Sequence, residues 1–295
     1  MNLNCKNRIL LFFIVIIQFS FAQSEYELRE SEMINVQKDI VGKLTGYLPI
    51  KGKKKIESRS KTSERKIVAD YLEDLLKEIG LKPKLNSYNV QDKKGNQFSG
   101  TNVYAVIPST TPSSEYVVLG AHYDTSDGSP GAIHNATGLA LTHYVASQLV
   151  KLSSRSKNFI IVYFDQQETS MIGCRMFAQK MKDDKVDIHS MHRVDYMGWD
   201  LDEDRAIELL ASSISLESLY RMESPVPVFK RLVSTPESRI FSTLGFETIT
   251  ITSELKNSDS SPYVHQSSDT YTTVNFKYLA STTDIVLNVF KVLAR

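Results

Sequence analysis

The sequence predicts an α/β fold: a three-layer sandwich in which helices flank a mostly parallel, mixed β-sheet. Apolar segments of strand length alternate with segments of helical pattern over residues 116–182, and this alternation is typical of a parallel sheet covered by helices. Polar residues that can bind ligands follow the apolar segments, as expected where strands end at a common edge of a sheet. The composition indicates no second globular unit, so we expect a single domain over residues 23–295.

The first 22 residues have the pattern of a signal peptide. Lys6 and Arg8 precede an almost wholly apolar run over residues 9–19, and Ser20-Phe21-Ala22 forms a small-x-small cleavage site. The apolar run is shorter than a membrane span requires. We therefore expect cleavage of residues 1–22, a secreted or periplasmic protein that begins at Gln23, and no transmembrane span after cleavage.

The next segments predict helices and a hairpin ahead of the parallel strands. Residues 25–48 have a loose helical pattern, and Ser63 is the expected N-cap of a stronger amphipathic helix that ends at Gly80. Residues 82–90 and 101–107 have strand patterns on either side of a turn-forming stretch at 92–96, which indicates a hairpin.

The remaining elements follow the α/β pattern. Strands are expected over residues 116–121, 158–164, 192–197 and 246–252, and helices over residues 138–152, 171–182 and 275–293. Residues 206–210 have the pattern of either a strand or a helix, and a short helix is expected over residues 228–233.

The strand expected over residues 116–121 leads into the His-x-Asp sequence of His122 and Asp124. A histidine and a carboxylate at a strand end suit a metal site, because the carboxylate can orient the imidazole. The alternative is an ordinary hydrogen-bonded surface histidine. A loop that contains several glycines then brings His134 and Asn135 to the start of the next helix.

Three later apolar segments also lead to residues that can bind a metal. Glu168 follows the strand expected over residues 158–164, Asp195 lies near the end of the next one, and His265 lies in the polar loop after the last. Histidine and carboxylate ligands in this combination match a zinc site. The sequence therefore favours a metal site over an isolated surface histidine.

Five motifs in fixed order resemble those of the di-zinc aminopeptidase family (clan MH): AHYD, HNATG, QETSMIGC, DYMG and VHQSSDT. That family also includes the bacterial leucyl aminopeptidases, glutamate carboxypeptidase, glutaminyl cyclase and the non-catalytic transferrin receptor ectodomain. The resemblance covers residues 60–295. It implies the zinc-exopeptidase (phosphorylase/hydrolase-like) fold and a peptide, or a peptide-like small molecule, as the ligand of the cleft.

The resemblance also implies a role for individual residues. His122 and Asp195 match the ligands of one zinc ion in the family, and Glu168 and His265 match the ligands of the other. Asp124 matches the aspartate that orients the first histidine.

The chain departs from the family at the two positions most important for hydrolysis. The family has a bridging aspartate before Asn135 and a general-base glutamate before Glu168, whereas this chain has His134 and Gln167 there. A third departure is Ser238, because Pro236-Glu237-Ser238 replaces a Ser-Asp-His sequence that often helps to shape the substrate pocket.

These replacements predict altered metal binding and weaker catalysis. A neutral imidazole offers one lone pair, so His134 can complete either pair of metal ligands but not both. It could bridge two zinc ions only as an imidazolate. We therefore expect one zinc ion or none rather than two. Local hydrogen bonding of His134, without metal, is the alternative. An amide cannot accept a proton at neutral pH, so Gln167 removes general-base assistance worth about 10²–10⁴-fold.

Two functions therefore remain open. The first is a catalytically impaired or non-catalytic member, a pseudoenzyme candidate that binds a peptide or a protein, and Gln167, His134 and Ser238 favour it. The alternative is an active aminopeptidase that removes N-terminal residues from peptides with a single zinc ion.

The overall composition argues against a different class of partner. The 35 Lys and Arg residues nearly balance the 34 Asp and Glu residues, so we expect no nucleic-acid partner. The basic run over residues 51–55 is interpreted as a solvated loop. Cys174 is the only cysteine after signal cleavage, which excludes an internal disulfide, and we expect it to be a packed core thiol.

Overall fold

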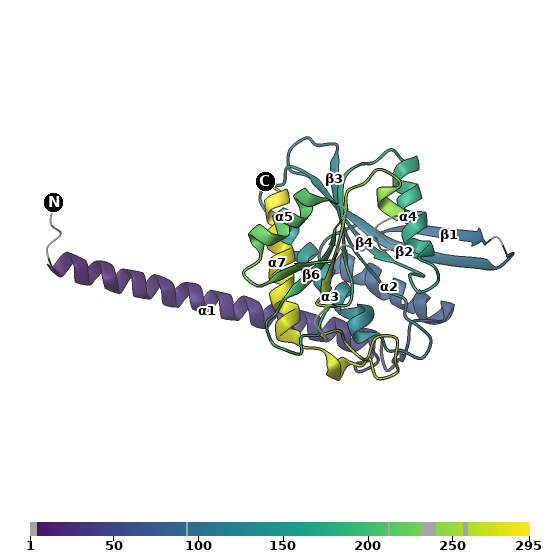
Figure 1. The fold of residues 1–295 in the computed structure, drawn as a ribbon, viewed down its shortest axis with the longest axis horizontal. Helices are drawn as coiled ribbons and strands as arrows, with labels where there is room; N and C mark the ends of the chain where they lie inside the picture. The colour runs from purple at the N-terminus through teal and green to yellow at the C-terminus, as the bar shows by residue number, and fades with distance from the viewer. Residues whose placement is uncertain (1–4, 93, 212, 232–239, 256–258) are drawn as a thin grey trace.

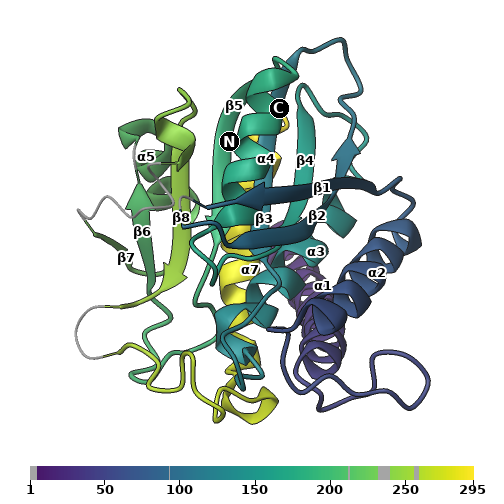
Figure 2. The same ribbon diagram turned by 90° about the vertical axis from the view of Figure 1, so that its right-hand side faces the viewer.

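The protein is represented by a computed structural model that describes residues 5–92, 94–211, 213–231, 240–255 and 259–295; within residues 5–23 only the backbone is described. The described strands form one eight-stranded mixed sheet of order β1-β2-β4-β3-β5-β8-β6-β7 (Figure 1 and Figure 2). The strands are β1 (Lys84–Gln91), β2 (Gln97–Ile107), β3 (Glu115–His122), β4 (Asn158–Phe164), β5 (Asp187–Val194), β6 (Ile207–Ala211), β7 (Val228–Lys230) and β8 (Thr248–Ser253).

The four central strands β4, β3, β5 and β8 are parallel. The flanking pairs β1–β2, β2–β4 and β6–β8 are antiparallel, and the short strand β7 pairs parallel with β6. The carboxyl ends of the central strands consequently lie at the same edge of the sheet, where ligand sites of α/β proteins gather.

Helices cover both faces of the sheet. They are α1 (Cys5–Leu44), α2 (Thr62–Glu78), α3 (Thr137–Leu149), α4 (Ile172–Asp183), α5 (Ile214–Glu223) and α7 (Phe276–Leu293), with a π-helical turn η1 (Ala132–Ala136) and a 3-10 turn η2 (Tyr271–Thr273). Figure 2 shows α4 in front of the sheet and α1, α3 and α7 behind it. The predicted three-layer α/β sandwich is confirmed.

Strand β4 explains why both faces must be covered. Every residue of its sequence NFIIVYF is buried. Phe159, Ile161 and Tyr163 pack in the core that includes α1, α2, α3 and α7, while Ile160, Val162 and Phe164 pack on the opposite side with Phe177 of α4. Side chains alternate between the faces of a strand, so an unbroken apolar run requires a core on each face.

Most of the expected elements are confirmed to within a few residues. The hairpin of β1 and β2, strands β3, β4 and β8 and helices α3, α4 and α7 lie where the apolar patterns predicted them. The strand expected over residues 192–197 had the wrong bounds: β5 spans Asp187–Val194, because its pairing with β3 begins at Asp187. Residues 206–210, whose sequence pattern fits either a strand or a helix, lie almost entirely in strand β6. Cys174 is buried and residues 51–55 are exposed, as expected.

Two other local predictions are wrong. The N-cap of α2 is Lys61 rather than Ser63, because the backbone of Lys61 is extended and its N–H donates to the carboxylate of Glu64 at 3.1 Å. Residues 228–230 form strand β7 instead of a helix, because pairing with β6 satisfies their backbone groups. Residues 232 and 233 lie outside the described part of the chain, as do Pro236, Glu237 and Ser238.

Helix α1 begins within the predicted signal peptide and continues past the expected cleavage position after Ala22. Its first part projects away from the domain, and its last part packs beside α3 and α7 (Figure 1). Signal cleavage and the domain limits of 23–295 stay predictions. Within the residues that the structure describes, no helix has the length and apolarity that crossing a membrane requires.

Candidate metal and peptide site

The fold brings the predicted site residues together at the carboxyl edge of the parallel strands. His122 is the last residue of β3, and Asp195 directly follows β5. Glu168 lies in the segment between β4 and α4, and His265 lies in the loop between β8 and η2. His134 reaches the same place from the π-helical turn η1, which precedes α3.

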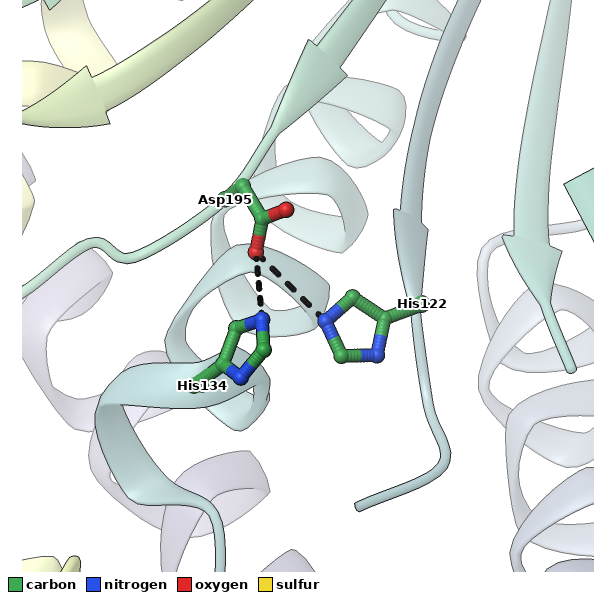
Figure 3. A group of neighbouring side chains, drawn as sticks. All are labelled: His122, His134 and Asp195. Carbon is green, nitrogen blue, oxygen red and sulfur yellow. Dashed lines mark ion pairs between the residues drawn. The ribbon is translucent and has the colours of Figure 1, made fainter. Parts of the chain in front are cut away.

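The first group of site residues consists of His122, His134 and Asp195 (Figure 3). Nε2 of His122 lies 3.4 Å from Oδ1 of Asp195, and Nε2 of His134 lies 3.2 Å from the same oxygen. All three side chains are buried. Two imidazole nitrogens and one carboxylate oxygen therefore converge on one point, as in a three-ligand zinc site.

The second group consists of His134, Glu168 and His265. Nδ1 of His134 lies 3.4 Å from Oε1 of Glu168, and Nε2 of His265 lies 3.2 Å from Oε2 of Glu168. This group is more open, because the side chain of His265 is 46% exposed. The two groups share the His134 ring and contact its two different nitrogens.

The position of His134 is set by its own backbone and by a stacked ring. The backbone N–H groups of Ile133 and His134 donate to the carboxylate of Asp269 at 2.8 and 3.2 Å. The ring of Tyr196 stacks on the His134 ring, with centroids 4.1 Å apart and planes 6° apart. The imidazole is thus held between the two groups.

Asp124 connects the end of β3 to the segment after β4. Its carboxylate accepts the backbone N–H groups of Gln167 and Glu168 at 2.8 and 2.9 Å, and Oδ1 lies 3.4 Å from Nδ1 of His122. Burial alone would raise the pKa of Asp124, but the hydrogen bonds from His122 and from these two N–H groups lower it. The contact with His122 fits the orienting role that the resemblance implied.

The charges of the first group support one another. Burial alone would lower the pKa of His122, but the carboxylates of Asp124 and Asp195 beside it raise it to about 10. Burial would likewise raise the pKa of Asp195, but His134 and His122 beside it hold that pKa well below its usual range.

One ring nitrogen in each group is also available to bind a metal ion. Among the described residues, Nε2 of His122 and Nδ1 of His134 are buried and have no hydrogen-bond partner. Buried polar atoms are normally hydrogen-bonded, and these two nitrogens belong to the first and the second group respectively. A zinc ion in either group would give such a nitrogen a ligand bond.

Gln167 is buried beside these groups, and the nearby carboxylate of Asp165, which could in principle act as a base in its place, is engaged elsewhere. Asp165 pairs with Nε of Arg65 at 2.8 Å and accepts the N–H of Thr101 at 3.0 Å. It lines a separate cavity of about 390 Å³ with both of these residues. Burial raises its pKa to about 6, but its pairing with Arg65 and Thr101 makes it a poor substitute for a glutamate at position 167.

Sequence reasoning missed two residues that support the site. Arg193 donates to Oδ2 of Asp195 at 3.1 Å, and Asp269 holds the backbone of His134. Arg193 and Asp195 are two residues apart at the end of a strand, so alternation could have placed them on one side of the sheet. Asp269 belongs to the VHQSSDT motif, but nothing in the motif indicates its contact with residues 133 and 134.

An α/β sheet whose parallel edge carries two neighbouring groups of histidine and carboxylate side chains is the framework of a zinc-binding protein. The model of peptidase family M28 matches residues 102–290, more than half of the chain. The chain therefore belongs to peptidase family M28, whose members include zinc aminopeptidases and relatives of glutaminyl cyclase.

Solved structures have the same fold. LapB from Legionella pneumophila is 22% identical, with a TM-score of 0.73, and the match covers 90% of this chain and 72% of that one. BSAP, a zinc aminopeptidase from Bacillus subtilis, is 10% identical, with a TM-score of 0.77 and coverage of 89% and 95%. Glutaminyl cyclase from Bacteroides thetaiotaomicron is 13% identical, with a TM-score of 0.70 and coverage of 87% and 96%. A search of curated proteins found no significant match.

Proposed function

We propose that this protein is an exported, zinc-binding member of peptidase family M28 that binds a peptide in its cleft and hydrolyses it poorly. One observation carries the proposal: Gln167 occupies the position of the family's general base, and each carboxylate near it among the described site residues is already engaged. Asp124 accepts two backbone N–H groups. Asp195 contacts two histidines and an arginine, and Glu168 contacts two histidines.

His122, His134 and Asp195 are the residues best suited to hold a single zinc ion, because they are buried and converge on one point. Zinc in such a site polarises a carbonyl and lowers the pKa of a bound water. The chain itself would hold the imidazoles through Asp124 and Asp269 and would exclude bulk water by burial. It offers an amide, rather than a carboxylate, where a proton must be accepted.

An active single-zinc aminopeptidase is the second candidate, and the position of Glu168 favours it. Oε1 of Glu168 lies 3.4 Å from His134, directly beside the first group. If zinc occupied the first group alone, Glu168 would be a carboxylate next to the metal that is able to accept a proton. The two candidates differ in activity and agree on the metal.

Zinc content in matched variants tests the metal assignment. After dialysis against a weak chelator we expect at most one zinc ion per chain in the wild type. We expect His122→Ala to lose this zinc and His265→Ala to keep it, because only His122 belongs to the buried group. Two tightly held zinc ions, or loss of zinc in His265→Ala alone, would contradict the assignment.

Export is proposed from the N-terminal sequence. The charged start, the apolar run and the small residues Ser20 and Ala22 support cleavage before Gln23. N-terminal sequencing of protein recovered outside the cytoplasm should give Gln23 as the first residue. A cytoplasmic product that begins at Met1 would count against export.

A further inference from the structure

A cavity of about 460 Å³ opens beside the buried metal-ligand group. Asp195 and Tyr196, which contact the two histidines, form one wall of this cavity. Strand β8 and the loop after it form much of the remainder, through Thr250, Thr252 and residues 260, 261 and 264. A peptide whose backbone lies at the metal group can therefore place a neighbouring side chain in this cavity.

Two arginines line the cavity. Arg193 is buried and donates to Asp195 at 3.1 Å, whereas the side chain of Arg231 is 40% exposed. Nε of Arg231 lies 3.8 Å from Oε1 of Glu208, a fully buried carboxylate whose Oε2 accepts the N–H of Leu255. Among the described residues that line the cavity, the charged groups are these two arginines and Asp195.

Two cations and one anion line the cavity, and the carboxylate of Glu208 lies behind Arg231. The one carboxylate on its wall, Asp195, already faces two histidines. A metal ion at Asp195 would offset that negative charge further and leave the guanidinium of Arg193 less compensated. An anionic group in the cavity would thus meet the guanidinium groups of Arg193 and Arg231 close to the metal group.

The rest of the lining suits a small polar group. Hydroxyl residues line the cavity together with the arginines. The hydroxyls of Thr252 and Ser260 donate to the carbonyls of Glu208 and Leu255, so Thr250 and Ser261 are the hydroxyl residues best suited to donate to a ligand. A carboxylate binds best where several N–H and O–H donors converge, and a guanidinium offers two parallel donors that match its two oxygens. Apolar lining comes from Leu210, Leu255 and Val264 and is sufficient to contact the short methylene stem of an acidic side chain.

We propose that this cavity binds an acidic side chain, that of aspartate or glutamate, next to the peptide bond held at the metal group, and that Arg231 determines the preference. The inference rests on the proposed peptide-binding function and names the substrate class. Arg231 is the specificity residue because its partly exposed guanidinium, whose contact with Glu208 among the described residues is a long one of 3.8 Å, can turn toward a ligand. Arg193 is a positioning residue, because it also holds Asp195.

The test measures binding of four tripeptides to the zinc-loaded protein by isothermal titration calorimetry. Glu-Ala-Ala is compared with Gln-Ala-Ala, and Ala-Glu-Ala with Ala-Gln-Ala, so that each pair differs in charge and hardly in shape. We expect the acidic peptide of one pair to bind roughly 10-fold to 100-fold more tightly than its neutral partner, as for a charge-assisted hydrogen bond in a partly buried site. Arg231→Gln should reduce this ratio to about one.

Two further variants control for net charge and for folding. Arg175→Gln removes an exposed arginine on α4 that lines a different cavity, and it should leave the preference unchanged. Arg231→Lys keeps a cation near Glu208 and should retain part of the preference. Thermal melting of each variant shows that it is folded before binding is compared.

The outcomes separate the two proposals. Equal binding within both pairs, or the same loss of preference in Arg175→Gln and Arg231→Gln, overturns the acidic-side-chain inference and leaves peptide binding intact. If none of the four peptides binds, both proposals fail. If mass spectrometry of the same samples shows rapid cleavage with the acidic preference preserved, the acidic-side-chain inference holds and the proposed impairment of hydrolysis is wrong.

Discussion

The chemistry of the site depends on one residue, His134. Its Nε2 faces Asp195 and its Nδ1 faces Glu168, so the ring lies between the two groups that could each hold a metal. A neutral imidazole has a lone pair on one nitrogen only. The ring can therefore serve one group at a time, and the other group lacks a third ligand.

Replacing His134 with a carboxylate should restore a second metal position. An aspartate has two oxygens that reach two metals, and its charge offsets theirs. We expect His134→Asp to raise the zinc content from at most one ion per chain toward two, as counted by elemental analysis after dialysis. His134→Ala is the control and should fall below the wild type. If His134→Asp held no more zinc than His134→Ala, the claim that the His134 ring limits the site to one metal ion would be wrong.

The sequence predicted the residues that gather at this site better than it predicted how they are held. His122, Glu168, Asp195 and His265 were identified because each is at or beyond the end of an apolar segment, and parallel strands bring such ends together. The contribution of Arg193 was missed although strand alternation places it on the same side as Asp195, because an arginine is not itself a metal ligand. The role of Ser238 cannot be compared, because it lies outside the described residues.

At the scale of elements, a buried arginine joins three segments that carry the site. The guanidinium of Arg59 is fully buried and donates to the carbonyls of Leu44 at the end of α1, Tyr123 after β3, and Pro130 and Gly131 before η1. The loops that carry Asp124 and His134 are thereby fixed to each other. Burial lowers the pKa of Arg59 to about 10, so the side chain stays charged at neutral pH.

Removing this guanidinium should destabilise the fold. Arg59→Met leaves several buried carbonyls without donors, and we expect the free energy of unfolding to fall by on the order of 4 kcal/mol. Urea unfolding followed by circular dichroism measures the change. Arg155→Met is the matched control: Arg155 also donates to carbonyls, of Pro108 and Leu152, but from a partly exposed position. Equal losses of unfolding free energy in Arg59→Met and Arg155→Met would show that the burial of Arg59 is unimportant.

The element boundaries show where sequence patterns are informative. The strand predicted over residues 158–164 has the bounds of β4, because an unbroken apolar run can satisfy both cores only as a central strand. Strand β7 has three half-buried residues, too few for any periodicity, and its identity depends on pairing with β6. The N-cap at Lys61 was missed because a lysine side chain is not a capping acceptor, and the N-cap backbone is held by Glu64 instead.

At the scale of the whole molecule, helices packed on one face of the sheet bury a histidine that has no role in the site. His143 lies in α3, and among the described residues its Nδ1 has no hydrogen-bond partner. Burial lowers its pKa from 6.5 to about 4. Because the folded-state pKa is the lower one, its contribution to stability is present above pH 6.5 and is lost as the pH falls toward 4.

This histidine should make the protein sensitive to acid. From pH 6.5 to pH 4, His143 alone should cost on the order of 3 kcal/mol of unfolding free energy. We expect His143→Leu to lose less stability than the wild type over this range. His189→Leu removes an exposed histidine that lowers the pKa of His192, and it should change the pH dependence less than His143→Leu does. His192, which is also buried and has a pKa of about 3, maintains part of the pH dependence in every variant. Identical profiles of unfolding free energy against pH for His143→Leu and the wild type would contradict the role of His143.

The central claim is that His134 and Gln167 together impair hydrolysis, and kcat/KM tests it most directly. The measurement uses a panel of aminoacyl-nitroanilides and peptides with wild type, His134→Asp, Gln167→Glu and the double variant, with zinc counted in each. We predict hydrolysis close to undetectable in the wild type and little gain in either single variant. The double variant should gain more than the two single effects combined, because base and metals act on one water and such effects are non-additive. Efficient, metal-dependent turnover by the wild type would contradict the claim.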